Sequence, residues 1–195
     1  YNNYVSNGYM TLDALRMLRA AGMDAMKFDV KGCEEPVTRH CGADVNVVWR
    51  NAREAKRLGM HVEIVTLLIP GVNDGDECLE ELIGRHLDSV GVETPLHFTA
   101  YYPAYRFTNP PTRVEDLERA HAKAVGEGVR YVYVGNIPGQ RFENTYCPRC
   151  GELVIRRHGL DSVEVRLGPG KSCMKCGEAI PIVGEAKSTR RRFAS

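Results

Sequence analysis

Four cysteines in the last third of the chain form two identical motifs. The sequence reads Cys147-Pro-Arg-Cys150-Gly and then Cys173-Met-Lys-Cys176-Gly. A Cys-x-x-Cys turn points both sulfur atoms to one side, and the following glycine can take the left-handed conformation that closes the turn. Two such turns supply four thiolates in a tetrahedral array, which is the closed coordination of structural zinc. The sequence therefore predicts a zinc ion bound by Cys147, Cys150, Cys173 and Cys176.

The segment between the two motifs is rich in β-forming residues. Leu153–Arg157 and Val163–Leu167 are expected to form a two-stranded ribbon joined at His158–Asp161. Residues 136–184 are therefore predicted to fold as a rubredoxin-like zinc ribbon. The thiolates alone do not select the metal, so iron in a rubredoxin-like site or an iron–sulfur cluster is the alternative. Two redox-active cysteine pairs are disfavoured, because no thioredoxin-like βαβ pattern surrounds them.

The composition is that of a globular protein. The 195 residues can hold one domain and a small module, and a net charge of +1 argues against a broad nucleic-acid-binding face. No apolar run approaches the ~20 residues that cross a bilayer, and no signal-peptide pattern opens the chain. Cys33, Cys41 and Cys78 are left after the metal ligands, and scattered thiols favour a cytoplasmic protein over a disulfide framework.

Residues 1–135 alternate between helical and strand patterns. Thr11, Asp44 and Thr112 are predicted to cap three helices, and residues 76–89 form a fourth. A strand end opens the chain, and four more strands are predicted at Ala25–Phe28, His61–Ile69, Pro95–Ala100 and Val129–Val134. Repeated αβ units of this spacing predict an α/β fold with a parallel sheet, either flat or curled into a barrel. Residues 185–195 are predicted to be a polar disordered tail.

Polar residues follow each predicted strand. Functional side chains in parallel αβ folds gather at the carboxyl ends of the strands. Asp29 and Lys31 alternate onto one side of the second strand, where they can hold the two charged groups of a zwitterion or a cation and an anion. A simple salt bridge is the structural alternative. Similarly, Asp74 is interpreted as a helix cap, and His97 as a core histidine.

Three segments resemble a known family. Ser6–Gly8, Phe28–Gly32 and Leu67–Asp74 are similar, in order and spacing, to the C-terminal half of a radical S-adenosylmethionine (SAM) enzyme, especially the glycyl-radical activases such as pyruvate formate-lyase activating enzyme. Further stretches resemble the radical SAM member of the AmmeMemoRadiSam system, which is associated with AMMECR1-like and Memo-like proteins. These stretches are Cys41–Asp44, Phe98–Tyr105, Gly135–Gly139 and Glu143–Gly151.

The resemblance implies a fold, a reaction and a set of contacts. The fold is a partial (β/α)6 barrel that binds SAM across the strand ends, where a [4Fe–4S] cluster cleaves it to a 5′-deoxyadenosyl radical. Ile64 and Val65 are expected in the core rather than at the cofactor. The implied cofactor contacts are Asn7, Gly8, Asp29 and Lys31 at the methionine end, with Leu67, Tyr101 and Tyr102 beside the ribose and adenine.

One feature of the family is absent from the chain. The C-x-x-x-C-x-x-C motif that holds the cluster does not occur, and Cys33, Cys41 and Cys78 cannot replace it. We therefore expect the C-terminal half of a radical SAM barrel, starting at the end of its third strand, with no catalytic residue assigned and its own catalytic competence left open. AMMECR1-like or Memo-like proteins, or a protein substrate, are the expected partners, with no membrane contact.

Two other interpretations remain. The first is a non-catalytic zinc-ribbon binding module on an αβ scaffold, in which Arg156, Arg157 and Arg166 form a basic face. The second is an ordinary αβ barrel enzyme that binds a phosphate. This interpretation ranks third, because the chain lacks a glycine-rich phosphate loop.

Overall fold

The computed structural model describes residues 1–137, 139–159 and 161–185. The chain divides into two compact units, Tyr1–Val134 (unit 1) and Gly135–Ser195 (unit 2). From residue 186 onward, the predicted polar tail lies outside the described residues. Within the described part of the chain, no helix is both long and apolar enough to cross a bilayer.

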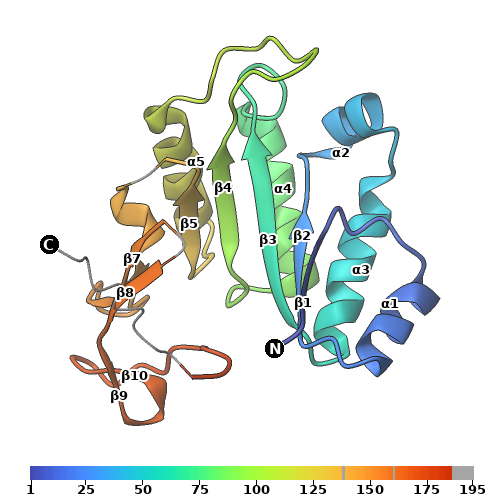
Figure 1. Cartoon of the computed structure of the whole chain (residues 1–195). Coiled ribbons are helices and arrows are strands. Elements are labelled where there is room, and N and C mark those ends of the chain that lie inside the picture. The colour runs from blue at the N-terminus through green and yellow to red at the C-terminus, as the bar shows by residue number, and fades with distance from the viewer. Residues whose placement is uncertain (138, 160, 186–195) are drawn as a thin grey trace, which may run out of the picture. The chain divides into compact units, whose positions relative to one another are not determined.

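Unit 1 is built on a five-stranded sheet (Figure 1). The strands are β1 (Asn3–Ser6), β2 (Ala25–Asp29), β3 (His61–Leu68), β4 (Leu96–Ala100) and β5 (Val132–Gly135). They follow one another in chain order across the sheet, and β1 to β4 pair in parallel. The predicted parallel α/β fold is confirmed. In the described residues the sheet is open and does not close into a barrel.

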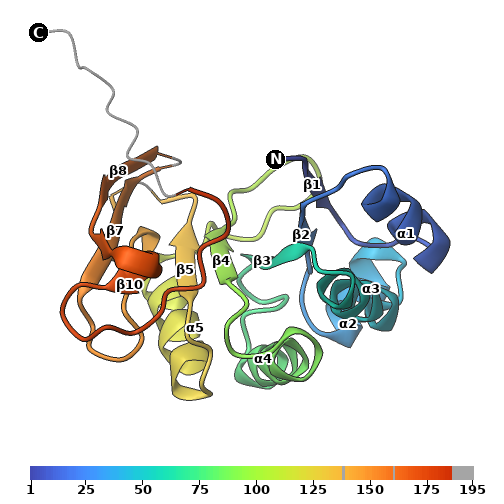
Figure 2. The same ribbon diagram turned by 90° about the horizontal axis from the view of Figure 1, so that it is seen from below.

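The helices connect successive strands. They are α1 (Leu12–Ala20), α2 (Glu34–Pro36), which continues into the π-helical turn η1 (Val37–Cys41), α3 (Val45–Arg57), α4 (Asp76–Val90) and α5 (Val114–Gly126). Figure 2 shows α3, α4 and α5 along one face of the sheet. Because the helices cover only one face of the sheet, residues along β3 alternate between half-exposed and buried. Ile64 is one of the buried residues and lies in the core. Val65 points to the other face and is not a core residue, contrary to the expectation.

Two of the three predicted helix caps are confirmed. The Thr11 hydroxyl accepts a hydrogen bond from the Ala14 amide (3.1 Å), and the Asp44 carboxylate accepts one from the Asn46 amide (2.9 Å).

The predicted helix cap at Thr112 is wrong. Helix α5 is capped at Arg113 without a side-chain hydrogen bond. The Thr112 hydroxyl instead accepts from the Tyr101 amide (2.8 Å) and donates to the Leu68 carbonyl (2.5 Å). Because this hydroxyl is buried, it satisfies two backbone groups where β3 and β4 end.

Unit 2 consists of short antiparallel strands. A three-stranded sheet contains β6 (Thr145–Tyr146), β7 (Leu153–His158) and β8 (Asp161–Val165), and a second pair contains β9 (Leu167–Gly168) and β10 (Ser172–Cys173). Two 3₁₀ turns, η2 (Arg141–Glu143) and η3 (Pro169–Lys171), complete the unit. The β7–β8 pair corresponds to the predicted ribbon, but β8 ends before Leu167. Leu167 pairs with Cys173 and so joins the ribbon to the second cysteine pair.

Candidate cofactor pocket and metal centre

A pocket of about 220 Å³ lies where β1 and β2 end. Three of the predicted cofactor contacts, Asn7, Asp29 and Lys31, line it together with Tyr9. The opposite wall comes from residues 37–43 and from the first turn of α3. The pocket therefore combines strand-end polar groups with a largely apolar wall, which is the usual composition of a small-molecule site.

Asp29 and Lys31 form the charged part of the pocket. The Lys31 ammonium donates to Oδ2 of Asp29 at 2.5 Å, so the salt bridge considered as the structural alternative is present, and it lies within the pocket. Oδ1 of Asp29 is buried and has no hydrogen-bond partner among the described residues. A buried carboxylate oxygen without a donor is costly, because water no longer solvates it. A ligand that brings an ammonium or hydroxyl group would satisfy it.

Gly8 and Asn7 shape the first strand end. Gly8 has φ of +71°, and a Cβ there would lie 2.6 Å from Cδ1 of Phe28, so only glycine fits. Asn51 holds this turn by donating to the Gly8 carbonyl (2.8 Å), while the Asn7 side chain accepts from the Tyr9 amide (3.0 Å). Gly8 therefore acts through the backbone and places Asn7 at the pocket.

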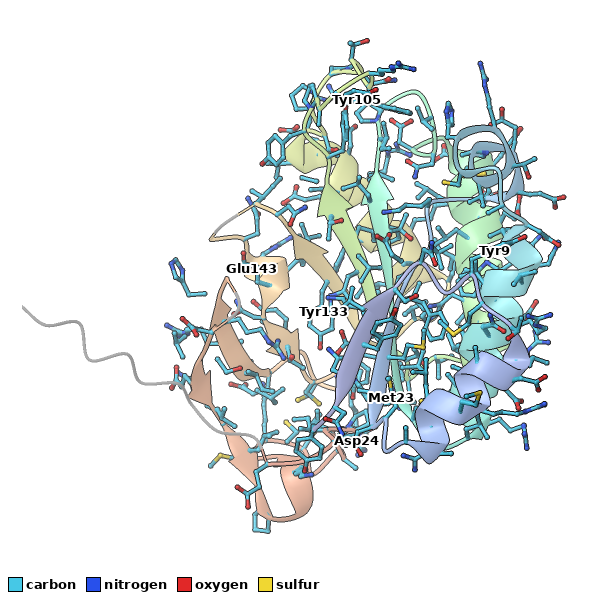
Figure 3. The ribbon with its side chains drawn as sticks, turned by 45° about the vertical axis from the view of Figure 1, so that its right-hand side comes forward. Tyr9, Met23, Asp24, Tyr105, Tyr133 and Glu143 are labelled. Carbon is cyan, nitrogen blue, oxygen red and sulfur yellow. A yellow bond between two sulfur atoms is a disulfide. The ribbon has the colours of Figure 1, made fainter. Side chains whose placement is uncertain are left out.

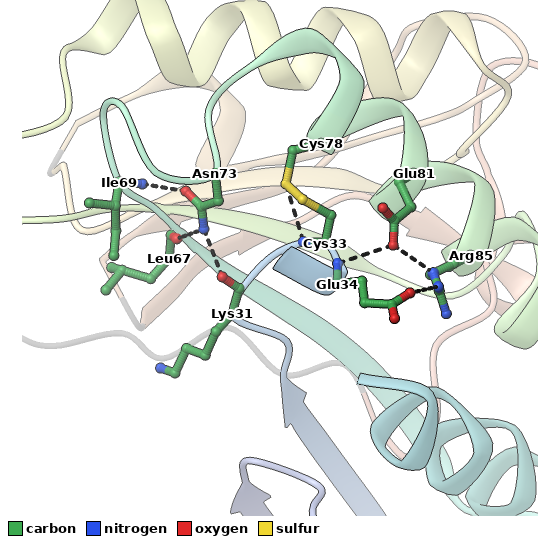
Figure 4. The surroundings of a disulfide bond; sticks show 9 residues. All are labelled: Lys31, Cys33, Glu34, Leu67, Ile69, Asn73, Cys78, Glu81 and Arg85. Carbon is green, nitrogen blue, oxygen red and sulfur yellow. Dashed lines mark hydrogen bonds and ion pairs between the residues drawn. A yellow bond between two sulfur atoms is a disulfide. The ribbon is translucent and has the colours of Figure 1, made fainter. Parts of the chain in front are cut away.

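Asn73 joins the ends of β2 and β3 (Figure 4). Its amide donates to the carbonyls of Lys31 and Leu67, both at 2.9 Å, and its oxygen accepts from the Ile69 amide at 2.7 Å. Asn73 is almost fully buried, and a Cβ on Gly32 would lie 2.9 Å from its Cβ. The side chain thus fixes the backbone that carries Lys31.

The predicted cap at Asp74 is wrong. Asp74 accepts from the Gly71 amide (2.7 Å) inside the turn after β3. Helix α4 begins after Gly75, which offers no side-chain cap.

Four predicted cofactor contacts lie outside the pocket lining: Gly8, which shapes the turn beside Asn7, and Leu67, Tyr101 and Tyr102. Tyr101 is buried, and its hydroxyl donates to the Phe107 carbonyl (2.8 Å). Tyr102 is 56% exposed. The structure therefore gathers the predicted residues of β1 and β2 and leaves those of β3 and β4 apart, because the pocket is local to one edge of the sheet.

Cys33 and Cys78 form a disulfide, with Cα atoms 5.2 Å apart (Figure 4). The expectation of three scattered thiols is wrong for this pair. Only Cys41 of the three stays free, and it is exposed at the pocket. The 45-residue separation concealed the pairing in the sequence. The β2–α3–β3 crossover brings the loop after β2 against the first turn of α4. The sequence analysis favoured a cytoplasmic protein because these thiols were expected to be unpaired. The disulfide removes that argument.

A second polar cluster lies on the sheet face opposite the helices. Glu63 contacts His61 (3.2 Å) and His97 (3.1 Å), and the His97 ring stacks on Tyr133. Burial opposes ionisation of Glu63, but its two histidine contacts and nearby Lys27 hold its pKa well below the usual range. His97 is therefore not the predicted core histidine. None of the four cluster residues belongs to the pocket lining, and Figure 3 shows Tyr133 apart from Tyr9 of the pocket.

The four motif cysteines come together in unit 2. All four Sγ atoms lie within 4.8 Å of one another, with 3.6 Å between Cys147 and Cys176 and 3.7 Å between Cys150 and Cys173. A tetrahedral ion with metal–sulfur bonds of about 2.3 Å needs sulfur atoms about 3.8 Å apart. A polynuclear cluster would hold the cysteines on different iron atoms and spread them further. The spacing therefore fits a single metal ion.

The two cysteine turns repeat one hydrogen-bond pattern. The Gly151 amide donates to the Cys147 carbonyl and the Gly177 amide to the Cys173 carbonyl, both at 2.9 Å. Both glycines have positive φ, as their position predicted. Burial opposes ionisation of Cys173, but hydrogen bonds from the Cys176 and Lys175 amides help to lower its pKa to about 7. Burial raises the pKa of Cys147, and the neighbouring thiols help to raise that of Cys150.

The chain is similar to known proteins in both sequence and fold. Residues 1–84 match the model of the Radical SAM superfamily. The curated protein "Uncharacterized protein MJ0808" of Methanocaldococcus jannaschii is 40% identical over 185 residues. That match covers 94% of this chain and 55% of the relative, so the chain spans about half of the relative's length.

Two solved structures share the fold. A domain of pyruvate-formate lyase-activating enzyme from Bacteroides vulgatus has a TM-score of 0.57 at 11% identity, over 69% of this chain and 80% of that one. A radical SAM methyltransferase from Sphaerobacter thermophilus has a TM-score of 0.50 at 20% identity, over 77% of this chain and 43% of that one. Residues 1–84 thus match the radical SAM model, and unit 1 shares its fold with these two structures.

Proposed function

We propose that unit 1 is the SAM-binding C-terminal part of a radical SAM enzyme related to the glycyl-radical activases, here the radical SAM member of the AmmeMemoRadiSam system. The superfamily match and the fold shared with a pyruvate-formate lyase-activating enzyme domain support this proposal. The observation that carries it is the unpartnered, buried Oδ1 of Asp29 in a pocket at the strand ends.

The pocket residues fit the methionine end of SAM. Oδ1 of Asp29 accepts a hydrogen bond from the α-amino group, and the Asp29 charge also attracts the sulfonium. The Lys31 ammonium pairs with the other oxygen of Asp29 and can also pair with the α-carboxylate of SAM. Val45 and Val48 supply apolar surface. When bound, SAM supplies the 5′-deoxyadenosyl group whose radical would abstract hydrogen from the substrate.

The described cysteines do not fit the radical-generating [4Fe–4S] cluster. Cys33 and Cys78 are bonded to each other, Cys41 is single, and the remaining four share one site in unit 2. None of these groups has the Cys-x-x-x-Cys-x-x-Cys spacing. In this proposal the cluster ligands belong to residues beyond this sequence, and unit 1 contributes cofactor binding.

For unit 2 we propose a structural zinc ion bound by Cys147, Cys150, Cys173 and Cys176. The proposal follows from the tetrahedral sulfur spacing and from the lack of an open ligand position in a four-thiolate site. Metal analysis of the purified protein distinguishes zinc from a rubredoxin-like iron centre, which would also colour the protein. AMMECR1-like or Memo-like partners are proposed on the family resemblance alone.

The alternative, a non-catalytic binding module with a basic face, has less support. Glu164 pairs with both Arg156 (3.5 Å) and Arg166 (2.7 Å). Arg157 donates to the Glu143 carbonyl (3.1 Å) and to the Thr145 hydroxyl (2.6 Å). These arginines are therefore engaged within unit 2, which weakens the case for an anionic partner.

The proposal is tested by titrating SAM into the intact protein and its Asp29→Asn variant. A lost hydrogen bond to a charged group costs about 1.5–3 kcal/mol, so affinity should fall about ten- to a hundredfold. Asp76→Asn is the matched control, because Asp76 also pairs with a cation, Arg119 (2.7 Å), but lies outside the pocket. Equal affinities of the parent and the Asp29 variant would contradict the assignment of this pocket.

A further inference from the structure

One wall of the pocket is a short segment that starts at a cysteine. Residues 33–43 run from Cys33 through α2 and η1, and Val37, Cys41, Gly42 and Ala43 of this segment line the pocket. The first residue of the segment is bonded to Cys78 in the first turn of α4 (Figure 4). The disulfide therefore connects the pocket wall to the helix layer.

The other ties between this segment and α4 are weak. The Glu34 amide donates to Glu81 (3.2 Å) and the Glu34 carboxylate pairs with Arg85 at 3.4 Å, both at exposed positions where water competes. Val37 adds a buried apolar anchor. The disulfide is thus the strongest link that holds the wall in place.

The strand-end charges are held independently of the disulfide. Asn73 fixes the Lys31 carbonyl from the β3 side, and Asp29 belongs to β2 itself. Breaking the disulfide would therefore release the wall at Cys33 and leave Asp29 and Lys31 in position.

The two cysteines differ in exposure. Cys33 is only 8% exposed, whereas Cys78 is half-buried, so Cys78 is the expected point of attack for an incoming thiolate. We propose that Cys33–Cys78 is a reversible redox modification site that sets the order of the pocket wall, and hence the affinity of the pocket for its ligand. The choice of SAM as that ligand rests on the proposed function.

The reaction needs a dithiol reductant. One of its thiolates attacks Sγ of Cys78, the Cys33–Cys78 bond breaks, and Cys33 leaves as a thiolate that takes up a proton. The second thiol of the reductant then displaces Cys78 as a thiol. Two electrons pass to the protein, and the reductant ends as a disulfide. An oxidised dithiol reverses the exchange.

Reduction lowers affinity by disordering the wall. The apparent affinity of a pocket falls in proportion to the fraction of molecules in the competent conformation. A wall that is ordered in about one tenth of the reduced molecules weakens SAM binding about tenfold.

The experiment compares the intact protein, purified without reductant, before and after treatment with dithiothreitol. Peptide-resolved alkylation should label Cys41 in both states and Cys33 and Cys78 only after reduction. Hydrogen exchange should then accelerate in residues 33–43, with β2, β3 and unit 2 unchanged. A SAM titration should show about tenfold weaker binding in the reduced state.

Two variants serve as controls. Cys41→Ser should keep the labelling of Cys33 and Cys78 after reduction and the faster exchange of the wall, whereas the double variant Cys33→Ser/Cys78→Ser should match the reduced protein and show no response to the reductant. If the double variant does not fold, the comparison of the two redox states of the parent decides the matter.

Two results would overturn the redox inference. They are complete alkylation of Cys33 and Cys78 without reduction, and unchanged exchange of the wall after it. A loosened wall with no SAM binding in either state would support the redox site and reject the proposed ligand instead.

Discussion

Units 1 and 2 achieve order by different means. Unit 1 buries a continuous layer of large apolar side chains between its sheet and its helices, among them Phe28, Ile64, Leu68 and Phe98. Unit 2 has five buried apolar residues in its described part: Cys147, Val154, Ile155, Cys173 and Ile180. Two of these five are candidate metal ligands. A unit of this size with so small a core needs a metal ion or another cross-link to stay folded.

The largest effect should come from breaking the metal centre. Cys150→Ser removes one ligand, and metal binding supplies on the order of 10–16 kcal/mol to small zinc-folded units. We expect loss of bound metal and unfolding of unit 2, with unit 1 intact. Metal analysis, with hydrogen exchange resolved by unit, checks this result. Uniform loss of protection in both units would show that they do not fold independently.

A core truncation should produce the opposite pattern. Phe98→Ala empties space at a fully buried position of β4, which typically costs about 3–5 kcal/mol. Unit 1 should unfold at a lower denaturant concentration than in the parent, while the metal content stays at the parental level. Loss of metal in this variant would refute the separation of the two units.

Acid should weaken unit 1 through one buried histidine. His86 is fully buried in α4, its Nε2 lies 3.1 Å from the Thr94 carbonyl, and burial lowers its pKa to about 4. The pKa of His86 in the folded state is below its unfolded value of about 6.5. The contribution of His86 to the free energy of unfolding is therefore complete above pH 6.5 and is lost as pH falls toward 4. His86→Gln, which can keep the hydrogen bond to Thr94 but does not titrate, should flatten this dependence. If the variant loses stability equally steeply as the pH falls, groups other than His86 cause the pH dependence.

The same contrast explains how far each region could be predicted. In unit 2 the candidate metal ligands follow from the spacing of the cysteines in the sequence alone. Each Cys-x-x-Cys turn places its own two sulfur atoms, independently of the surrounding strands. In unit 1 the helical and strand patterns predicted the parallel sheet, and the residues Thr11 and Asp44 predicted two helix caps, since both kinds of signal are local in the chain. The Thr112 hydroxyl shows the limit: its sequence context matches a cap, but the nearby ends of β3 and β4 offered it buried partners.

The sequence by itself determined the α/β class, the cysteine site and the charged pair Asp29–Lys31, because each depends on residues close together in the chain. Tertiary structure decided which strand ends share a pocket, and it excluded Leu67, Tyr101 and Tyr102 from it. It also decided the Cys33–Cys78 bond and the role of Asn73. Those contacts join segments 40 or more residues apart, and their partners are set by the crossovers that fold the sheet, which no local pattern encodes.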